Sequence, residues 1–287
     1  MKQIKKPNFI VIGSMKSGTT TLCHLLAQHP DVFMANPKEL EFFCKDDIYA
    51  RGWDWYLSLF ADAKNGSAIG EGSTSYTKSP LFPNVPEKIA RHLPDARLIY
   101  IVRHPLDRIE SHWMHRVRHG DTRSFKKMLQ DYPNLIDTSR YWYQIQQYRK
   151  YFGDDQILII FFDDLKKNPG NVLEQCFSFL GVDPRIKLSN PDERLYVTRE
   201  FNVESNLLKR ARANSALSVA SRFIPAHVKK YIRERLDIQV DGRPVWDPKK
   251  RQWAINEIVE DVRIFLDFYG KPVDFWDLRT TRESPSE

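Results

Sequence analysis

Three short apolar runs dominate the hydrophobic pattern of this chain, at Asn8–Ile12, Arg97–Val102 and Gln156–Phe162. Each run is continuous rather than alternating, which is typical of a strand buried on both faces. Gly153 and Gly181 stand where C-terminal helix caps are expected. Strands that alternate with helices predict an α/β fold with a parallel sheet, whose ligands bind beyond the carboxyl ends of the strands. The helices predicted from apolar residues at helical spacing are Thr19–Gln28, Val85–His92, Leu106–Arg118, Tyr141–Phe152 and Asn171–Leu180.

Two stretches interrupt this alternation. Residues from about 119 to 140 are polar and mixed, and residues from about 190 to 245 are basic and poor in predicted strands. Both are interpreted as insertions or as a cap over the sheet, with solvated helix faces as the alternative. A last long helix is predicted at Pro248–Tyr269, and the polar tail at 280–287 is expected to be flexible. We therefore expect a single domain over residues 1–279, in which about 190–245 form the cap or substrate region.

The composition is that of an ordinary globular protein, with 41% hydrophobic and 28% charged residues among 287. This length suffices for one large domain or two small ones. The net charge of +7 fits a nucleic acid, an anionic membrane surface or small anionic ligands as partners. Because no block of five or six consecutive basic residues occurs, a tail that binds nucleic acid is not expected.

The cysteines and the apolar runs bear on location. Cys23, Cys44 and Cys176 are scattered without metal-like spacing, so we expect reduced thiols in a cytosolic setting. The first apolar run has only five residues, too few for the core of a signal peptide. No window reaches 18 apolar residues, so no transmembrane helix is expected. The sequence thus predicts a cytoplasmic protein.

The first strand leads into a glycine-bracketed loop and then a helix, over Gly13–Thr21. Backbone N–H groups and the positive end of a helix converge there, so this segment predicts a phosphate site. The spacing resembles a Walker A loop, in which a Lys directly follows the second Gly. Here Thr19 follows Gly18, and Lys16 lies two residues before that Gly. The cradle is kept, but the lysine reaches the phosphates from a different place.

A second motif follows the strand at Arg97–Val102, where Arg103 and Pro105 precede a helix that contains Ser111. Pro105 suits the first turn of a helix, so Arg103 is expected at the carboxyl edge of the sheet. A guanidinium there can hold a phosphate through two hydrogen bonds. Taken alone, Arg103 could equally be a structural residue paired with an acidic neighbour.

Together the two motifs resemble those of the sulfotransferases that use 3′-phosphoadenosine 5′-phosphosulfate (PAPS). In that family a Lys-x-Gly-Thr-Thr loop wraps the 5′-phosphosulfate, and an Arg-x-Pro segment with a Ser eight residues after the Arg binds the 3′-phosphate. The resemblance implies a three-layer, P-loop-like fold with a central parallel sheet flanked by helices, and a helical or loop cap over the acceptor cleft. It implies PAPS as co-substrate and no metal. The donor-binding residues that it implies are Lys16, Ser17, Gly18, Thr19, Thr20, Thr21, Arg103 and Ser111.

The segment Pro37–Phe43 resembles one ending in Glu-x-x-Phe-Phe. In the carbohydrate branch of the family, which includes heparan sulfate sulfotransferases, that segment supplies the catalytic carboxylate. The resemblance makes Glu39 the general base that takes a proton from an attacking hydroxyl or amine. The alternative role for Glu39 is a capping or salt-bridged surface residue. Glu41, two residues further on, is expected to point elsewhere if the segment is extended. Lys16 is implied to stabilise the negative charge on the leaving adenosine 3′,5′-bisphosphate (PAP).

Other positions carry a weaker resemblance. Glu71–Tyr76 is similar to a segment that lines the cleft in the family, and Lys78 either reaches substrate or donor or is simply exposed. Arg199 is implied to belong to the loop that covers the adenine end of the donor. No cluster of His and Cys suggests a metal site. The histidines interpreted as incidental are His24, His29, His112, His115 and His119.

The resemblance predicts a sulfotransferase that acts on a carbohydrate or a small natural product. Two other functions stay open at this point. A P-loop kinase or other NTPase requires a Lys directly after Gly18, although Asp163 and Asp164 imitate a Walker B carboxylate. A non-catalytic module could keep the donor cradle, although the presence of Lys16 and Glu39 favours catalysis.

Overall fold

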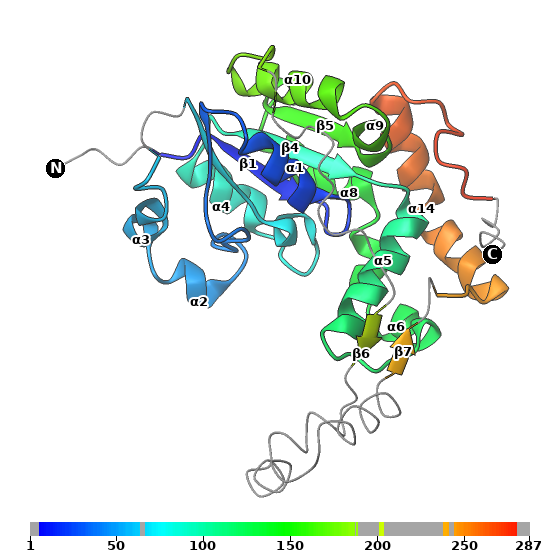
Figure 1. Cartoon of the computed structure of the whole chain (residues 1–287). Coiled ribbons are helices and arrows are strands. Elements are labelled where there is room, and N and C mark those ends of the chain that lie inside the picture. Colours follow the sequence, from blue (N-terminus) through cyan, green and yellow to red (C-terminus); the bar gives the residue numbers. More distant parts are fainter. Residues whose placement is uncertain are drawn as a thin grey trace, which may run out of the picture.

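The computed structural model describes residues 6–63, 67–186, 188, 201–203, 238–240 and 244–279. Within them lies a sheet of five parallel strands in the order β2-β3-β1-β4-β5 (Figure 1). β1 lies between β3 and β4, so the loop that follows it emerges at the centre of the sheet's carboxyl edge. The strands are β1 (Phe9–Gly13), β2 (Val32–Met34), β3 (Ala68–Gly72), β4 (Arg97–Val102) and β5 (Ile157–Phe161).

Helices cover both faces of this sheet (Figure 1). In the described residues the α-helices bounded by the structure are α1 (Thr19–Leu26), α2 (Asp46–Tyr49), α3 (Trp53–Ser58), α4 (Val85–His92), α5 (Pro105–Arg118), α6 (Phe125–Asp131), α7 (Asn134–Asp137), α8 (Tyr141–Arg149), α9 (Phe162–Lys167), α10 (Pro169–Leu180) and α14 (Pro248–Phe268). Two 3₁₀ helices are η1 (Thr74–Thr77) and η2 (Asp154–Gln156).

The side chains of β1 alternate between two apolar clusters. Phe9 and Val11 face a cluster that includes residues of α1 and α10. Ile10 and Ile12 face a larger cluster that includes residues of α4, α8 and α14. Because the strand buries both faces, its sequence is continuously apolar. The predicted α/β fold with a central parallel sheet between helical layers is confirmed.

The bounds of β4 and α4 match the prediction, but two strands were missed. β2 has only three residues, and β3 (Ala-Ile-Gly-Glu-Gly) carries two glycines and a glutamate instead of an apolar run. Gly181 caps α10 in a left-handed conformation, with φ of 75°, as predicted. The predicted cap at Gly153 is wrong, because α8 ends at Arg149 and Gly153 instead precedes η2 with φ of −68°.

The polar stretch at 119–140 holds the short helices α6 and α7. Their apolar residues belong to the larger cluster, so this stretch packs onto the domain. Within the predicted cap at 190–245, the backbones of β6 (Phe201–Val203) and β7 (Ile238–Val240) pair antiparallel, and β6 lies against α5 (Figure 1). Apart from these strands and its last two residues, 190–245 lies outside the described residues, as does the tail at 280–287. The extent of the single domain stays a prediction.

The first turn of α8 is capped from another helix, which gives a test of the fold. Asp261 of α14 accepts hydrogen bonds from the backbone N–H groups of Trp142 (2.9 Å) and Tyr143 (2.7 Å). We expect Asp261→Ala to lower the free energy of unfolding by about 1–2 kcal/mol, the usual cost of losing a helix cap. Asp267→Ala, at an exposed position of the same helix, is the control and should cost much less. Urea unfolding followed by circular dichroism measures both, and equal losses would contradict the capping role.

Candidate active site

The loop between β1 and α1 turns sharply at the carboxyl edge of the sheet. Lys16 (φ 71°) and Gly18 (φ 91°) both adopt left-handed conformations. The hydroxyls of Ser14 and Ser17 are buried and lie 2.5 Å apart, and the N–H of Ser14 donates to the carbonyl of Ile101 in β4 (2.7 Å). These contacts turn the two serines inward and leave Lys16 partly exposed.

The end of the loop leads directly into the N-terminus of α1. Glycine is required at position 18, because a Cβ there would lie 2.6 Å from the Phe162 ring. α1 begins at the next residue without a side-chain cap and without an acidic residue in its first turn. Backbone donors at such an uncapped helix N-terminus suit a bound anion. The predicted donor residues therefore lie together in the end of the loop and the first turn of α1: Lys16, Ser17, Gly18, Thr19, Thr20 and Thr21.

Arg103 follows β4 directly and lies against this loop. Its Nη1 donates to the carbonyl of Lys16 (3.4 Å), and its guanidinium carbon lies 5.3 Å from the centroid of the Phe162 ring. Asp107 is 3.7 Å from Nη2, so the structural alternative for Arg103 also has a partner. Ser111 is buried two turns into α5, the helix that Arg103 precedes. The two residues implied to bind the 3′-phosphate therefore flank one helix start, beside the loop.

Glu39 lies on the loop after β2 and is held by the end of β3. Its carboxylate accepts hydrogen bonds from the hydroxyl (2.9 Å) and the N–H (3.2 Å) of Thr74, and its own N–H donates to the carbonyl of Gly72 (3.1 Å). Nζ of Lys38 lies 2.8 Å from the carboxylate, whose side chain is 36% exposed. The carboxylate is therefore fixed in place and still reachable by a substrate.

The protonation state of Glu39 suits a base. Burial raises its pKa, but the charge of Lys38 and hydrogen bonds from Lys38 and Thr74 outweigh burial, so the pKa lies below its usual value. Glu39 is consequently ionised at neutral pH and able to accept a proton.

The expectation for Glu41 assumed an extended segment, and the structure does not meet that condition. Glu39 (φ 67°) and Glu41 (φ 52°) both have left-handed conformations, so this segment is not a regular strand. Glu41 accepts a hydrogen bond from the hydroxyl of Ser75 (2.6 Å), next to the Thr74 that holds Glu39. The two carboxylates therefore lie along the same 3₁₀ helix, η1.

A buried carboxyl group, that of Glu71, helps to position the segment that carries Glu39 and Glu41. Glu71 is fully buried in β3 and accepts hydrogen bonds from the hydroxyls of Tyr56 (2.9 Å), Ser73 (2.6 Å) and Tyr76 (2.8 Å). The hydroxyl of Ser73 also accepts the N–H of Glu41 (3.0 Å). Burial raises the pKa of Glu71, although these hydroxyl donors oppose the shift. Glu71 is thus buried and positions the loop that carries Glu39.

Lys16, the basic residue of the loop between β1 and α1, has a strongly shifted pKa. Its pKa is lowered to about 8, first by burial and then by the charges of Arg118 and Arg103, while Glu39 opposes the shift. These influences place Lys16 within electrostatic range of all three charged side chains. An anion bound at the loop would offset the two cations and raise the pKa of Lys16.

His115, interpreted from the sequence as incidental, lies within electrostatic range of Lys16 and Glu39. Its pKa is lowered to about 4 by burial and then by the charges of Lys16 and His119, whereas Glu39 raises it. Ser111, His115 and Arg118 are spaced i, i+4 and i+7, so they share one face of α5. That spacing from Ser111 is the signal that could have identified both His115 and Arg118.

The carboxylates that imitate a Walker B motif are engaged elsewhere. Asp163 accepts a hydrogen bond from Nε1 of Trp276 (3.1 Å), and Asp164 pairs with Lys271 (2.9 Å). Both follow β5, the edge strand, which β4 separates from β1. No group of three or more His, Cys, Asp or Glu side chains that could hold a metal ion occurs in the described part of the chain.

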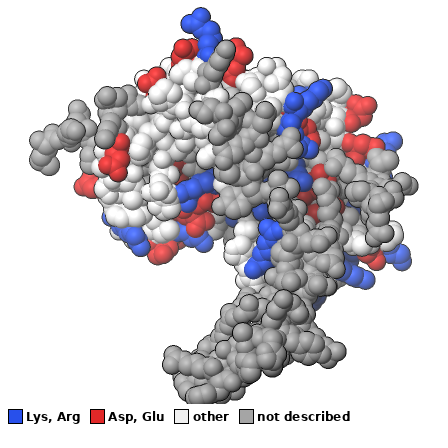
Figure 2. Space-filling model, viewed as in Figure 1, with Lys and Arg blue, Asp and Glu red and all other residues white. Residues whose placement is uncertain are grey.

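The charged surface shows no single dominant patch in the view of Figure 2, where Lys and Arg are interspersed with Asp and Glu over the described residues. The net charge of +7 is therefore not gathered in one place on the visible part of this face. Across the described ranges, no helix combines the length and the apolar character needed to span a bilayer.

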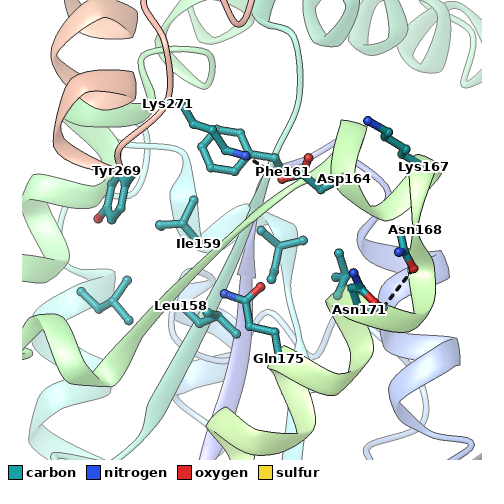
Figure 3. Close-up of a pocket in the computed structure, with 13 residues that line it drawn as sticks. Leu158, Ile159, Phe161, Asp164, Lys167, Asn168, Asn171, Gln175, Tyr269 and Lys271 are labelled. Carbon is teal, nitrogen blue, oxygen red and sulfur yellow. Dashed lines mark hydrogen bonds and ion pairs between the residues drawn. The ribbon is translucent and has the colours of Figure 1, made fainter.

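A separate hollow of about 710 Å³ runs along the outer edge of β5 (Figure 3). Asn171 and Gln175 of α10 line one side, and Tyr269 and Lys271, which follow α14, line the other. None of the predicted donor or base residues that the structure describes lines this hollow, so it is distinct from the candidate site.

Lys16 beside Arg103 and Glu39, with no lysine after Gly18, sets this site apart from that of P-loop kinases. It suits a class of enzymes that transfer a group from an anionic nucleotide donor to an acceptor. A family model described as the sulfotransferase domain matches residues 6–220. The chain belongs to the sulfotransferase family, and the predicted family is confirmed.

The chain is also similar to several curated proteins that share one description. The chain is 32% identical over 205 residues to the bifunctional heparan sulfate N-deacetylase/N-sulfotransferase 3 of Mus musculus and 31% identical to that of Homo sapiens. The bifunctional enzyme 2 of Bos taurus is 30% identical over 200 residues. The match to the mouse enzyme covers 64% of this chain but only 23% of the relative.

Solved structures show the same fold. A sulfotransferase from Alicyclobacillus acidocaldarius superposes with a TM-score of 0.69 at 22% identity, covering 95% of this chain and 99% of that one. The sulfotransferase domain from the curacin biosynthetic pathway gives a TM-score of 0.51 at 17% identity, covering 88% and 98%. At these identities the similarity concerns the fold alone.

The low pKa of Lys16 leads to a test by proton uptake. Above about pH 8 the free lysine is partly neutral, and a bound anion restores its charge, so binding of PAP should take up protons in that range. Affinity for PAP should accordingly fall as the pH rises through 8. Calorimetric titration at pH 8.5, in two buffers of different ionisation enthalpy, measures the uptake. Lys16→Met should remove it, and uptake unchanged in that variant would assign it to another group.

Proposed function

We propose that this chain moves the sulfuryl group of PAPS to an amine or hydroxyl of a carbohydrate acceptor, with Glu39 as the general base. The observation that carries the proposal is the ionised carboxylate of Glu39, fixed by Thr74 within electrostatic range of Lys16 on the donor loop. A base and a leaving-group cation at one edge of the sheet suit in-line transfer.

The acceptor class draws support from the relatives and from local charge. The curated relatives are named as heparan sulfate N-sulfotransferases, and this chain spans 23% of the length of the mouse enzyme. Lys38 and Lys78 are partly buried beside Glu39, and Arg118 is exposed near Lys16. These cations favour an acceptor that itself carries negative charge. Transfer to nitrogen and transfer to oxygen are both compatible with a carboxylate base.

The proposed step conserves atoms and charge. The acceptor nitrogen or oxygen forms a bond to sulfur as the bond from sulfur to the bridging phosphate oxygen breaks, and the electron pair stays on that oxygen. Glu39 takes the acceptor proton, and Lys16 with the N–H groups at the start of α1 stabilises the charge on PAP.

The donor site in this proposal consists of residues 16–21 with Arg103 and Ser111. The proximity of Arg103 to the carbonyl of Lys16 (3.4 Å) supports one continuous site for both ends of the donor. Arg199, implied by resemblance for the adenine end, lies outside the described residues. The cytoplasmic location expected from the sequence stays a prediction.

Two variants separate donor binding from transfer. Glu39→Gln should keep the thermal stabilisation by PAP but lose transfer, because the amide cannot accept the proton. Lys16→Ala should lose about a hundredfold or more in turnover, because one preorganised donor to a developing charge contributes about 3–4 kcal/mol. Labelled PAPS with pools of carbohydrate acceptors measures transfer.

ATP with Mg²⁺ is the control ligand for the thermal shift. Stabilisation by ATP with Mg²⁺ but not by PAP would overturn the donor assignment in favour of an NTPase. Full activity of Glu39→Gln would move the base to another residue, and PAP binding without transfer to any acceptor would favour a non-catalytic module.

A further inference from the structure

Arg108, in α5, is among the largest fully buried side chains, with 0% exposure. It lies five residues after Arg103 and three before Ser111, yet its guanidinium points into the protein. Burying a guanidinium costs free energy unless its charge or its hydrogen bonds are compensated. Its partners therefore show what it does.

All hydrogen-bond partners of Arg108 are neutral. Nε donates to the hydroxyl of Ser139 (2.6 Å), and Nη2 donates to the carbonyl of Leu135. Nη1 donates to Nδ1 of His112 (3.2 Å) and to the carbonyl of Met15 (3.5 Å). The N–H groups are thus satisfied, but neutral acceptors do not cancel the charge.

Among the described residues, none balances this positive charge in an ion pair. No carboxylate in the described residues forms an ion pair with Arg108. Burial and the charge of Arg108 lower the pKa of His112 well below its usual value, so this histidine stays neutral and accepts from the guanidinium. Burial lowers the pKa of Arg108 to about 10, which leaves it charged at neutral pH.

The unbalanced charge lies directly behind the donor loop. Met15, whose carbonyl Nη1 contacts, precedes Lys16, and the carbonyl of Lys16 itself is contacted by Arg103. Two arginines therefore contact successive carbonyls of one loop. In the trans peptide between Met15 and Lys16 the N–H points opposite to the carbonyl, so a carbonyl turned toward Arg108 turns the N–H of Lys16 away from it.

We propose that Arg108 is a positioning residue for the donor, whose buried positive charge attracts the phosphate groups through the loop without touching them. The proposal rests on donor binding at the β1 loop, as proposed above. The charge that the protein leaves unbalanced is then compensated by the bound donor. Charges separated by the thickness of a loop still interact appreciably inside a protein, because the effective dielectric is far below that of water.

Binding of PAP to charge-altering variants tests this role. Arg108→Met removes the charge and should weaken PAP binding by about tenfold or more, as measured by calorimetry at a temperature where the variant is folded. Arg108→Lys keeps a charge but loses the planar fork, so at pH 6.5 it should retain most of the affinity despite a lower melting temperature. Arg108→Gln is a second neutral replacement, for the case in which Arg108→Met does not fold.

Arg97→Met is the matched control. The Arg97 guanidinium also donates to a backbone carbonyl, that of Leu180 (2.7 Å), but it lies at the amino end of β4. Arg97→Met should lower the melting temperature and leave the dissociation constant of PAP unchanged. Wild-type affinity in folded Arg108→Met or Arg108→Gln would overturn the proposal, as would Arg108→Lys binding as weakly as the neutral variants. Failure of the unmodified protein to bind PAP would instead overturn the donor site itself.

Discussion

The site depends on one constraint, the parallel direction of all the strands in the central sheet. Parallel strands place their carboxyl ends at one edge, so the segments that follow β1, β2, β3 and β4 meet there. Lys16 and Arg103 are 87 residues apart in the chain and still make contact through the backbone. Glu39 and Thr74 come from two further segments and complete the same edge.

Buried ionisable side chains contact two of these segments, the loop after β1 and the segment that carries Glu39. Glu71 lies below the loop of Glu39 and is satisfied by three hydroxyl groups. Arg108 lies behind the donor loop and is satisfied by neutral acceptors. Groups of this kind cost free energy to bury, and their occurrence beside the site is typical of edges where function, rather than stability, determines the residues. Each supports a loop that carries a partly exposed residue of the candidate site, Glu39 or Lys16.

Local patterns predicted the elements that carry an unambiguous signal. β4 is a continuous apolar run, and α4 has apolar positions at helical spacing, so both were predicted with their observed bounds. β3 escaped because glycines at 70 and 72 replace apolar residues, and the structure shows why: a Cβ on Gly70 would lie 2.4 Å from the carbonyl oxygen of Phe9. Close packing between neighbouring strands, rather than strand propensity, determines those residues.

The sequence by itself determined the class of the protein, because the loop Gly13–Thr21 and the segment Arg103–Ser111 are local motifs whose spacing is visible in one dimension. Only the tertiary structure decided which other side chains join them. The surroundings of Glu41, His115 and Arg108 are not visible in the local sequence, because they consist of contacts and charges from distant segments. A one-dimensional pattern records spacing along the chain, whereas burial and electrostatic range depend on distances that arise only when the sheet brings its carboxyl ends together.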